Sequence, residues 1–93
     1  MPRLLETLEY GTPLLSATEG KVGEVRGVFA IGETRVPVSL LVYWDDTHEE
    51  TLLDADEVLT ISDDGVVLRS VRKMYEVLPA YDPRTNPLLH RLA

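Results

Sequence analysis

The chain has no cysteine among its 93 residues. Disulfide bridges and thiolate metal sites are therefore excluded, and a hydrophobic core must supply most of the stability. The hydrophobic fraction of 44% is enough for one such core, and a chain of this length forms a single domain. Because a composition without cysteine suits a reducing compartment, we expect a cytoplasmic protein.

The chain also lacks a long apolar run. The longest strongly apolar stretch, residues 36–44, is much shorter than the roughly 20 residues of a membrane-spanning helix. Glu6 and Glu9 follow closely on the first apolar residues and interrupt any signal-peptide core. We therefore expect no membrane insertion.

Basic side chains are few, with 9 Lys and Arg against 16 Asp and Glu and a formal net charge of -7. This charge opposes attraction to phosphate backbones. Arg69, Arg72 and Lys73 are close together in the sequence, but we interpret them as the solvated face of a helix. Direct binding to nucleic acid is not expected.

Motifs for catalysis are missing as well. The chain has no Gly-x-Ser-x-Gly, and its two histidines, His48 and His90, stand in a predicted loop and in the tail, where nothing orients them. Gly20 and Lys21 are without the upstream glycine and the following Ser or Thr of a phosphate-binding loop. We predict that the protein is not an enzyme, with no catalytic residue and no cofactor.

Acidic side chains gather in two places that offer an alternative, a site for a divalent cation or a small ligand. The first group is a predicted hairpin tip made of Asp45, Asp46, His48, Glu49 and Glu50. The second group would meet at one barrel end and comprises Asp54, Asp56, Glu57, Asp63 and Asp64. The first spacing matches no known ligand loop, and polar turn residues need no ligand to explain them. We therefore predict no metal site.

What the chain does have is a strand punctuated by glycine. Gly20, Gly23 and Gly27 interrupt a run of valines that predicts a strand over residues 21–31. Glycine inside a strand marks a bulge, a barrel corner or a close approach of another backbone. Small closed barrels need such a bent strand, so this segment predicts a barrel.

Several other short strands are predicted around it. Residues 12–16, 36–44, 51–53, 58–61 and 66–68 are apolar or alternating runs separated by turn residues. Asp64-Gly65 is the clearest hairpin signal. The alternation in residues 36–44 predicts one face for the core, made of Val36, Val38, Leu40, Val42 and Trp44. These elements predict a mostly β fold, a small antiparallel barrel or roll of about six strands.

The periodicity changes after the barrel. Val71, Met74, Tyr75 and Leu78 have the i, i+3, i+4, i+7 spacing of one helical face. We predict a short C-terminal helix that begins after an N-cap at Ser70 and ends at Pro79. Residues 88–92 would form a last turn or fray. The chain thus divides into a barrel, residues 1–69, and a helix and tail, residues 70–93, that pack on the barrel or on a partner subunit.

Three segments of the chain resemble the PRC-barrel family, named for the cytoplasmic domain of the photosynthetic reaction centre H subunit. They are residues 20–28, 53–58 and 63–68, and residues 77–82 are similar to the helix-then-proline ending of stand-alone bacterial members. Asp54 stands where the family commonly has proline. The resemblance implies a compact PRC-barrel-like, SH3-like antiparallel barrel that acts through protein surfaces and carries no common catalytic residue set.

Aromatic and apolar side chains near the sheet end suggest where a partner would bind, because such anchors dominate protein interfaces. The candidate partner-binding residues are Leu41, Tyr43, Trp44, Met74, Tyr75 and Leu78. The alternative is intramolecular, with the wall at Leu41 and Tyr43 covering the apolar helix face. If the helix or an edge strand crosses to a second subunit, the protein is a homodimer, which is the state we expect.

These inferences lead to one functional expectation and two alternatives. We expect a non-enzymatic protein–protein interaction or adaptor module of the PRC-barrel type, acting on a protein partner. The first alternative is an accessory factor in ribosome maturation or RNA processing that binds a basic ribosomal protein, which the acidity favours over RNA itself. The second is the barrel that binds a small ligand or a divalent cation.

Overall fold

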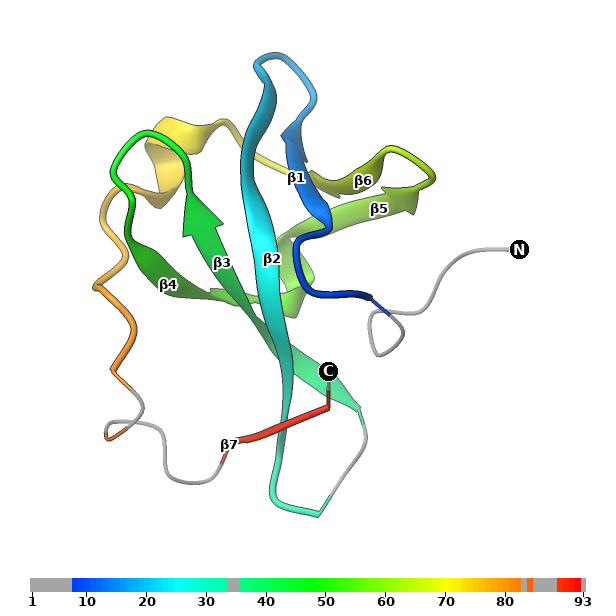
Figure 1. Ribbon diagram of the computed structural model, residues 1–93, viewed down its shortest axis with the longest axis vertical. Helices are drawn as coiled ribbons and strands as arrows, with labels where there is room; N and C mark the ends of the chain where they lie inside the picture. Colours follow the sequence, from blue (N-terminus) through cyan, green and yellow to red (C-terminus); the bar gives the residue numbers. More distant parts are fainter. Residues whose placement is uncertain (1–7, 34–35, 83, 85–88, 93) are drawn as a thin grey trace.

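The computed structural model describes residues 8–33, 36–82, 84 and 89–92, and shows one curled sheet that forms a half-barrel (Figure 1). Six strands follow the order β4-β3-β2-β1-β6-β5, and a seventh, β7, pairs with β2. The strands are β1 Pro13–Ser16, β2 Gly20–Ile31, β3 Pro37–Trp44, β4 Glu50–Asp54, β5 Val58–Ser62, β6 Gly65–Leu68 and β7 Leu89–Arg91. The prediction of a mostly β fold with about six barrel strands is confirmed.

The sheet is not purely antiparallel, contrary to the prediction. β1 pairs in parallel with β6, with Leu14 opposite Val66 and Ser16 opposite Leu68. The other pairs are antiparallel. Parallel pairing requires the chain to pass around the sheet between the two strands, and β2 to β5 make that passage. Local turn signals cannot reveal it, because they report only on neighbouring strands.

The glycine-punctuated strand is the long β2, as predicted, and it runs through the centre of the sheet (Figure 1). It pairs with β3 along one edge, and with β1 and then β7 along the other. Its register with β3 shifts between Val25 and Gly27 and again between Phe29 and Ala30. Such bulges bend and twist a strand, which lets β2 serve both halves of the curled sheet.

The core fills the inside of the curl. Its largest fully buried side chains are Trp44, Leu14, Leu40, Leu53, Leu68, Val25, Val28, Val42 and Val66. The predicted core face of residues 36–44 is correct for Leu40, Val42 and Trp44, but Val38 is half-buried and Val36 is 67% exposed. Val36 precedes the first paired residue of β3, Pro37, so the alternation of the strand does not extend to it.

The predicted C-terminal helix is wrong. Residues 70–78 contain only a four-residue 3-10 helix, η3 Arg72–Tyr75, and Val71 rather than Ser70 precedes it. The backbone N–H of Ser70 donates to the hydroxyl of Tyr75 at 3.2 Å. Few residues remain before Pro79, and a short isolated helix is marginal in water. Tertiary contacts made by Tyr75 and by Arg72 therefore decide the local backbone.

The C-terminal segment packs on the barrel of its own chain. Tyr75 joins the core, Tyr81 N–H donates to Glu50 O at 2.7 Å on β4, and β7 pairs with β2. Residues 89–91 are thus a strand, neither a helical turn nor a frayed end, while residue 88 of the predicted turn lies outside the described residues. In the described part of the chain, no helix is long and apolar enough to span a membrane.

Candidate functional site

The six predicted partner-binding residues occupy different environments. Leu41, Trp44 and Tyr75 are buried within the chain, with Trp44 only 1% exposed. Tyr43 and Leu78 are half-buried, and Met74 is 65% exposed. Tyr43 lies on the outer face of β3, whereas Met74 lies in η3 and Leu78 follows three residues after its end. The structure therefore divides the predicted surface in two and places Trp44 and Tyr75 in the core.

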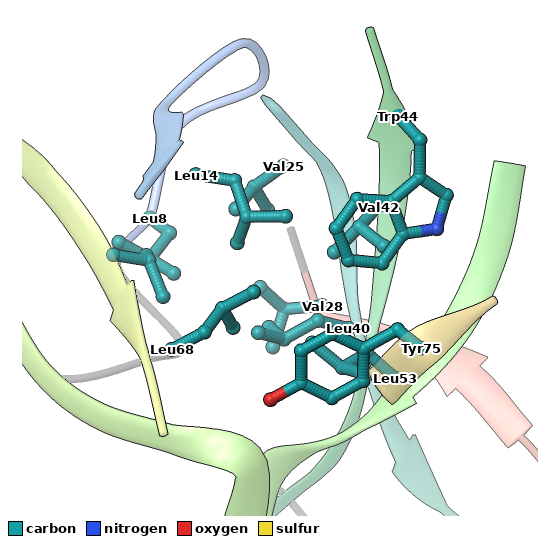
Figure 2. Close-up of a cluster of buried hydrophobic side chains, with 11 residues drawn as sticks. Leu8, Leu14, Val25, Val28, Leu40, Val42, Trp44, Leu53, Leu68 and Tyr75 are labelled. Carbon is teal, nitrogen blue, oxygen red and sulfur yellow. The ribbon is translucent and has the colours of Figure 1, made fainter. Parts of the chain in front are cut away.

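Trp44 joins the end of β3 to η3 (Figure 2). The rings of Trp44 and Tyr75 are stacked, with centroids 5.7 Å apart and an interplanar angle of 17°. The indole N–H of Trp44 donates to Thr51 Oγ1 at 2.8 Å, so its polar atom is satisfied. The intramolecular cover for η3 is therefore the core ring of Trp44, not the outer wall at Leu41 and Tyr43.

Arg72 fastens η3 to two loops at the same end of the barrel. Its guanidinium lies 4.1 Å from the centroid of the Trp44 ring, and its Nε donates to Asp46 Oδ1 at 3.2 Å. Its backbone N–H donates to Glu19 Oε1 at 2.8 Å. Arg72 is buried and belongs to the structural framework of η3, so the predicted solvated basic face does not include it.

An open pocket lies between η3 and η2, the 3-10 helix Ala55–Glu57 that joins β4 to β5. Its volume is about 310 Å³. The residues that line it are Leu53, Asp54, Glu57, Ser70, Met74, Tyr75 and Leu78. We call this pocket the η2–η3 groove. Three of the six predicted partner-binding residues meet in it.

The groove combines an apolar lining with an acidic rim. Leu53, Met74 and Leu78 provide aliphatic surface, and Asp54 and Glu57 are the charged residues of the lining. Asp54 also caps η2, because its Oδ1 accepts the backbone N–H of Asp56 at 3.0 Å. Val77, which lies between the groove residues Tyr75 and Leu78 in the sequence, is 86% exposed. Exposed aliphatic side chains next to an apolar pocket are typical of a surface that binds another protein.

Tyr75 forms part of the groove and makes the stability depend on pH. Burial raises the pKa of its hydroxyl above 10.0, and the Glu57 carboxylate raises it further, against opposing hydrogen bonds from Ser70. A raised folded pKa means that the neutral hydroxyl stabilises the fold below pH 10, and that this contribution is lost as the pH rises through the folded pKa. We therefore expect the free energy of unfolding to fall above about pH 10.

Urea denaturation at pH 8 and pH 11, followed by circular dichroism, checks this prediction. Tyr75→Phe keeps the ring and should reduce the loss of stability between the two pH values. At pH 8 the variant should be less stable by about 1 kcal/mol, because it loses the hydrogen bond with Ser70. Equal losses in wild type and Tyr75→Phe would contradict the assignment to this residue.

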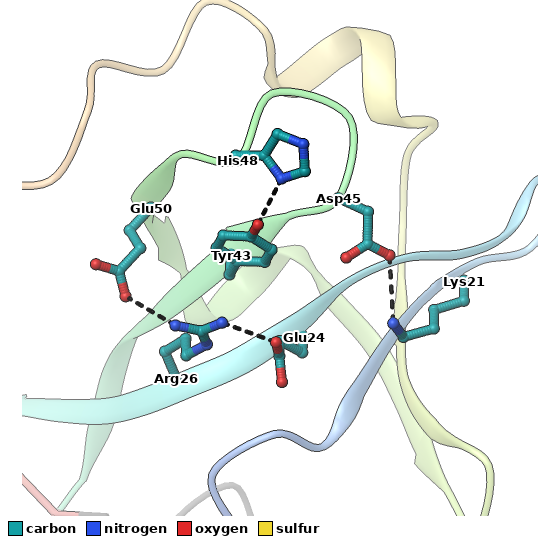
Figure 3. A network of polar contacts seen from close by, with 7 residues as sticks. All are labelled: Lys21, Glu24, Arg26, Tyr43, Asp45, His48 and Glu50. Carbon is teal, nitrogen blue, oxygen red and sulfur yellow. Dashed lines mark hydrogen bonds and ion pairs between the residues drawn. The ribbon is translucent and has the colours of Figure 1, made fainter.

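A second polar cluster covers the outer face of β2 and β3 (Figure 3). The guanidinium of Arg26 lies 4.4 Å from the Tyr43 ring centroid and donates to Glu24 at 2.8 Å. The hydrogen bond with Glu24 raises the pKa of Arg26. The Tyr43 hydroxyl is 2.6 Å from Nδ1 of His48, a turn residue with a positive φ of 59°. Arg26 pairs with Glu24 and lies 4.0 Å from Glu50, so carboxylates of the same chain balance its charge.

The acidic hairpin tip predicted from residues 45–50 has separate partners for its side chains. Asp45 pairs with Lys21 at 3.3 Å, Asp46 with Arg72, and His48 with Tyr43. Glu50 lies 4.0 Å from Arg26. Across the described ranges, no three His, Cys, Asp or Glu side chains are grouped so that they would hold a metal ion.

Sequence reasoning did not predict the groove. It selected Met74, Tyr75 and Leu78 for a helical face and treated Asp54 and Glu57 as polar turn residues. The two sets meet because β4 and η2 pass beside η3 in the folded chain. The only sequence signal was the apolar residue Leu53 directly before an acidic turn, which is too common to identify a site. Comparisons with family models, curated proteins and solved structures find no match to the chain.

Proposed function

We propose that this protein is a non-enzymatic interaction module of the PRC-barrel type, which binds a protein partner through the η2–η3 groove. The observation that carries the proposal is the meeting of Leu53, Met74 and Leu78 in one open pocket beside the exposed Val77. Apolar anchors near the centre of a contact surface supply most of the binding energy in protein interfaces.

The curled sheet supports this role because it provides a rigid frame for the groove. One wall is β4 with η2, and the other is η3, which the Trp44 stack and the two carboxylate contacts of Arg72 hold in place. A surface that is fixed before binding loses little conformational entropy when the partner arrives. The PRC-barrel resemblance of residues 20–28, 53–58 and 63–68 is consistent with a module that acts through its surface.

Affinity capture from native cell extract, with matched surface variants, tests the proposal. We expect a partner captured by the wild type to be lost with Met74→Asp and kept with Leu59→Asp. Leu59 is a fitting control because it is 52% exposed on β5 and is not among the residues that line the groove. Mass spectrometry identifies the bound proteins. A partner that Met74→Asp retains, or one lost equally with both variants, would contradict binding at the groove.

The expected homodimer stays a prediction and is measured separately. Sedimentation of the wild type and of both variants gives the subunit count, and it distinguishes loss of a partner from loss of a second copy. If Met74→Asp converts a dimer to a monomer without changing what is captured, the groove is the dimer interface and the proposed binding of another protein is wrong.

A further inference from the structure

The lining of the η2–η3 groove limits what it can bind. A volume of about 310 Å³ is at the small end of the range for ligand sites, which is roughly 300–1,000 Å³. The pocket is also open to solvent, and Met74 in its lining is 65% exposed. This shape suits one or two side chains of a polypeptide that lies across the opening.

The charge of the groove selects among such polypeptides. Its charged lining residues are Asp54 and Glu57, and both are acidic. Asp54 Oδ1 accepts one backbone N–H, and the Glu57 carboxylate interacts with the Tyr75 hydroxyl. Neither carboxylate forms an ion pair within the described residues. Carboxylates at the rim of an apolar pocket favour a partner with cationic side chains next to its apolar anchor, and they disfavour an acidic partner.

The same reasoning makes a second copy of the chain a poor occupant. Each copy carries a formal net charge of -7, so two copies repel one another as they approach. A basic partner gains from this charge at long range as well as at the groove. Met74 suits a pocket for varied anchors, because its unbranched thioether side chain adapts to different shapes.

We infer that the η2–η3 groove binds a segment of another protein in which a large apolar side chain is flanked by lysine or arginine. The apolar side chain occupies the space between Leu53, Met74 and Leu78, and the cation lies against Asp54 and Glu57. This inference rests on the proposed function and adds the chemical class of the partner.

Three synthetic nine-residue peptides test the inference on the intact protein. Each has one leucine in a glycine and serine background, flanked by two lysines, two glutamates or two serines. Met74 and Met1 are the only methionines in the chain, so the ¹³C-methyl signal of Met74 reports directly on the groove, and Met74→Leu assigns it. We expect saturable shifts with the lysine peptide and at least about fivefold weaker binding of the serine peptide.

Charge variants with a matched control test the role of the rim. Asp54→Asn with Glu57→Gln removes both charges, and asparagine keeps the oxygen that caps η2. The control, Glu33→Gln with Asp64→Asn, removes the same charge from the β2–β3 and β5–β6 turns, which lie away from η3 (Figure 1). We expect the rim variant, Asp54→Asn with Glu57→Gln, to bind the lysine peptide about fivefold more weakly than the wild type. The control variant should bind it less than about twofold more weakly.

Each outcome decides the inference. The inference is supported if the lysine peptide binds most tightly of the three and if its binding is weakened in the rim variant but not in the control variant. Equal binding of the three peptides would overturn the selection for cations but leave an apolar docking groove standing. If none shifts the Met74 methyl at millimolar concentration, the inference is wrong, while the capture experiment with Met74→Asp still decides the proposed function. The peptide series uses wild-type protein, so its result does not depend on whether the rim variant folds.

Discussion

Trp44→Ala is expected to lower the free energy of unfolding by about 3–5 kcal/mol. The substitution leaves a cavity at a fully buried position and removes the stack with Tyr75. It also leaves the hydroxyl of Thr51 without the indole N–H, and the guanidinium of Arg72 without the ring beneath it. A domain of this size has a total stability of about 5–14 kcal/mol, so the variant should lose a large share of it.

Urea denaturation followed by circular dichroism measures this effect, since the only tryptophan in the chain is the one removed. Trp44→Phe is the matched control: it keeps an aromatic ring for Tyr75 but loses the hydrogen bond to Thr51, and should cost about 1–2 kcal/mol. Equal stabilities of Trp44→Ala and Trp44→Phe would mean that an aromatic ring at residue 44 does not hold η3 on the barrel.

Gly23→Ala is expected to lower the free energy of unfolding by about 3 kcal/mol, although it adds only a methyl group. A Cβ at residue 23 would overlap with the backbone carbonyl oxygen of Tyr43 on the adjacent strand β3. Backbone cannot move aside as a side chain can, so β2 and β3 would have to separate locally. That separation would disturb the pairing of Gly23 with Trp44 and the neighbouring pair of Glu24 with Tyr43.

Gly27→Ala in the same strand is the control. A Cβ there would meet the end of the Arg91 side chain rather than backbone, so it should change stability by no more than about 1 kcal/mol. Thermal denaturation of the two variants gives the comparison. Equal stabilities would mean that β3 yields to the new methyl group, and that the close approach at Gly23 does not hold the curl of the sheet.

The strands β1 to β6 could be predicted because each depends on local features, whereas the segment that contains β7 was expected to form a helical turn or to fray. The turn at Asp63 and Asp64 gives the β5–β6 hairpin, in which Ser62 pairs with Gly65, and the glycines of β2 predict a bent central strand. Alternation selected Leu40, Val42 and Trp44 for the core. The alternation did not hold at Val36, because a sequence pattern does not show at which residue the pairing of β3 with its neighbours begins.

The candidate site was predicted only in part. Met74, Tyr75 and Leu78 were selected for their helical spacing, yet they reach the groove from a 3-10 turn and the residues after it. Asp54 and Glu57 were read as turn residues, because nothing in their sequence context shows that η3 lies opposite them. Trp44 was proposed for a partner surface, although Tyr75 of the same chain covers it.

The sequence by itself determined the class of this protein: an acidic, cysteine-free and mostly β chain built on a bent central strand. These properties follow from composition, alternation and turn residues, which act over a few neighbouring positions. Tertiary structure decided the parallel pairing of β1 with β6, the short 3-10 turn in place of a helix, and the η2–η3 groove. Each of these arises from contacts between residues far apart in the chain, such as Trp44 with Tyr75 and Glu19 with Arg72, whose energies outweigh the local preferences of the backbone.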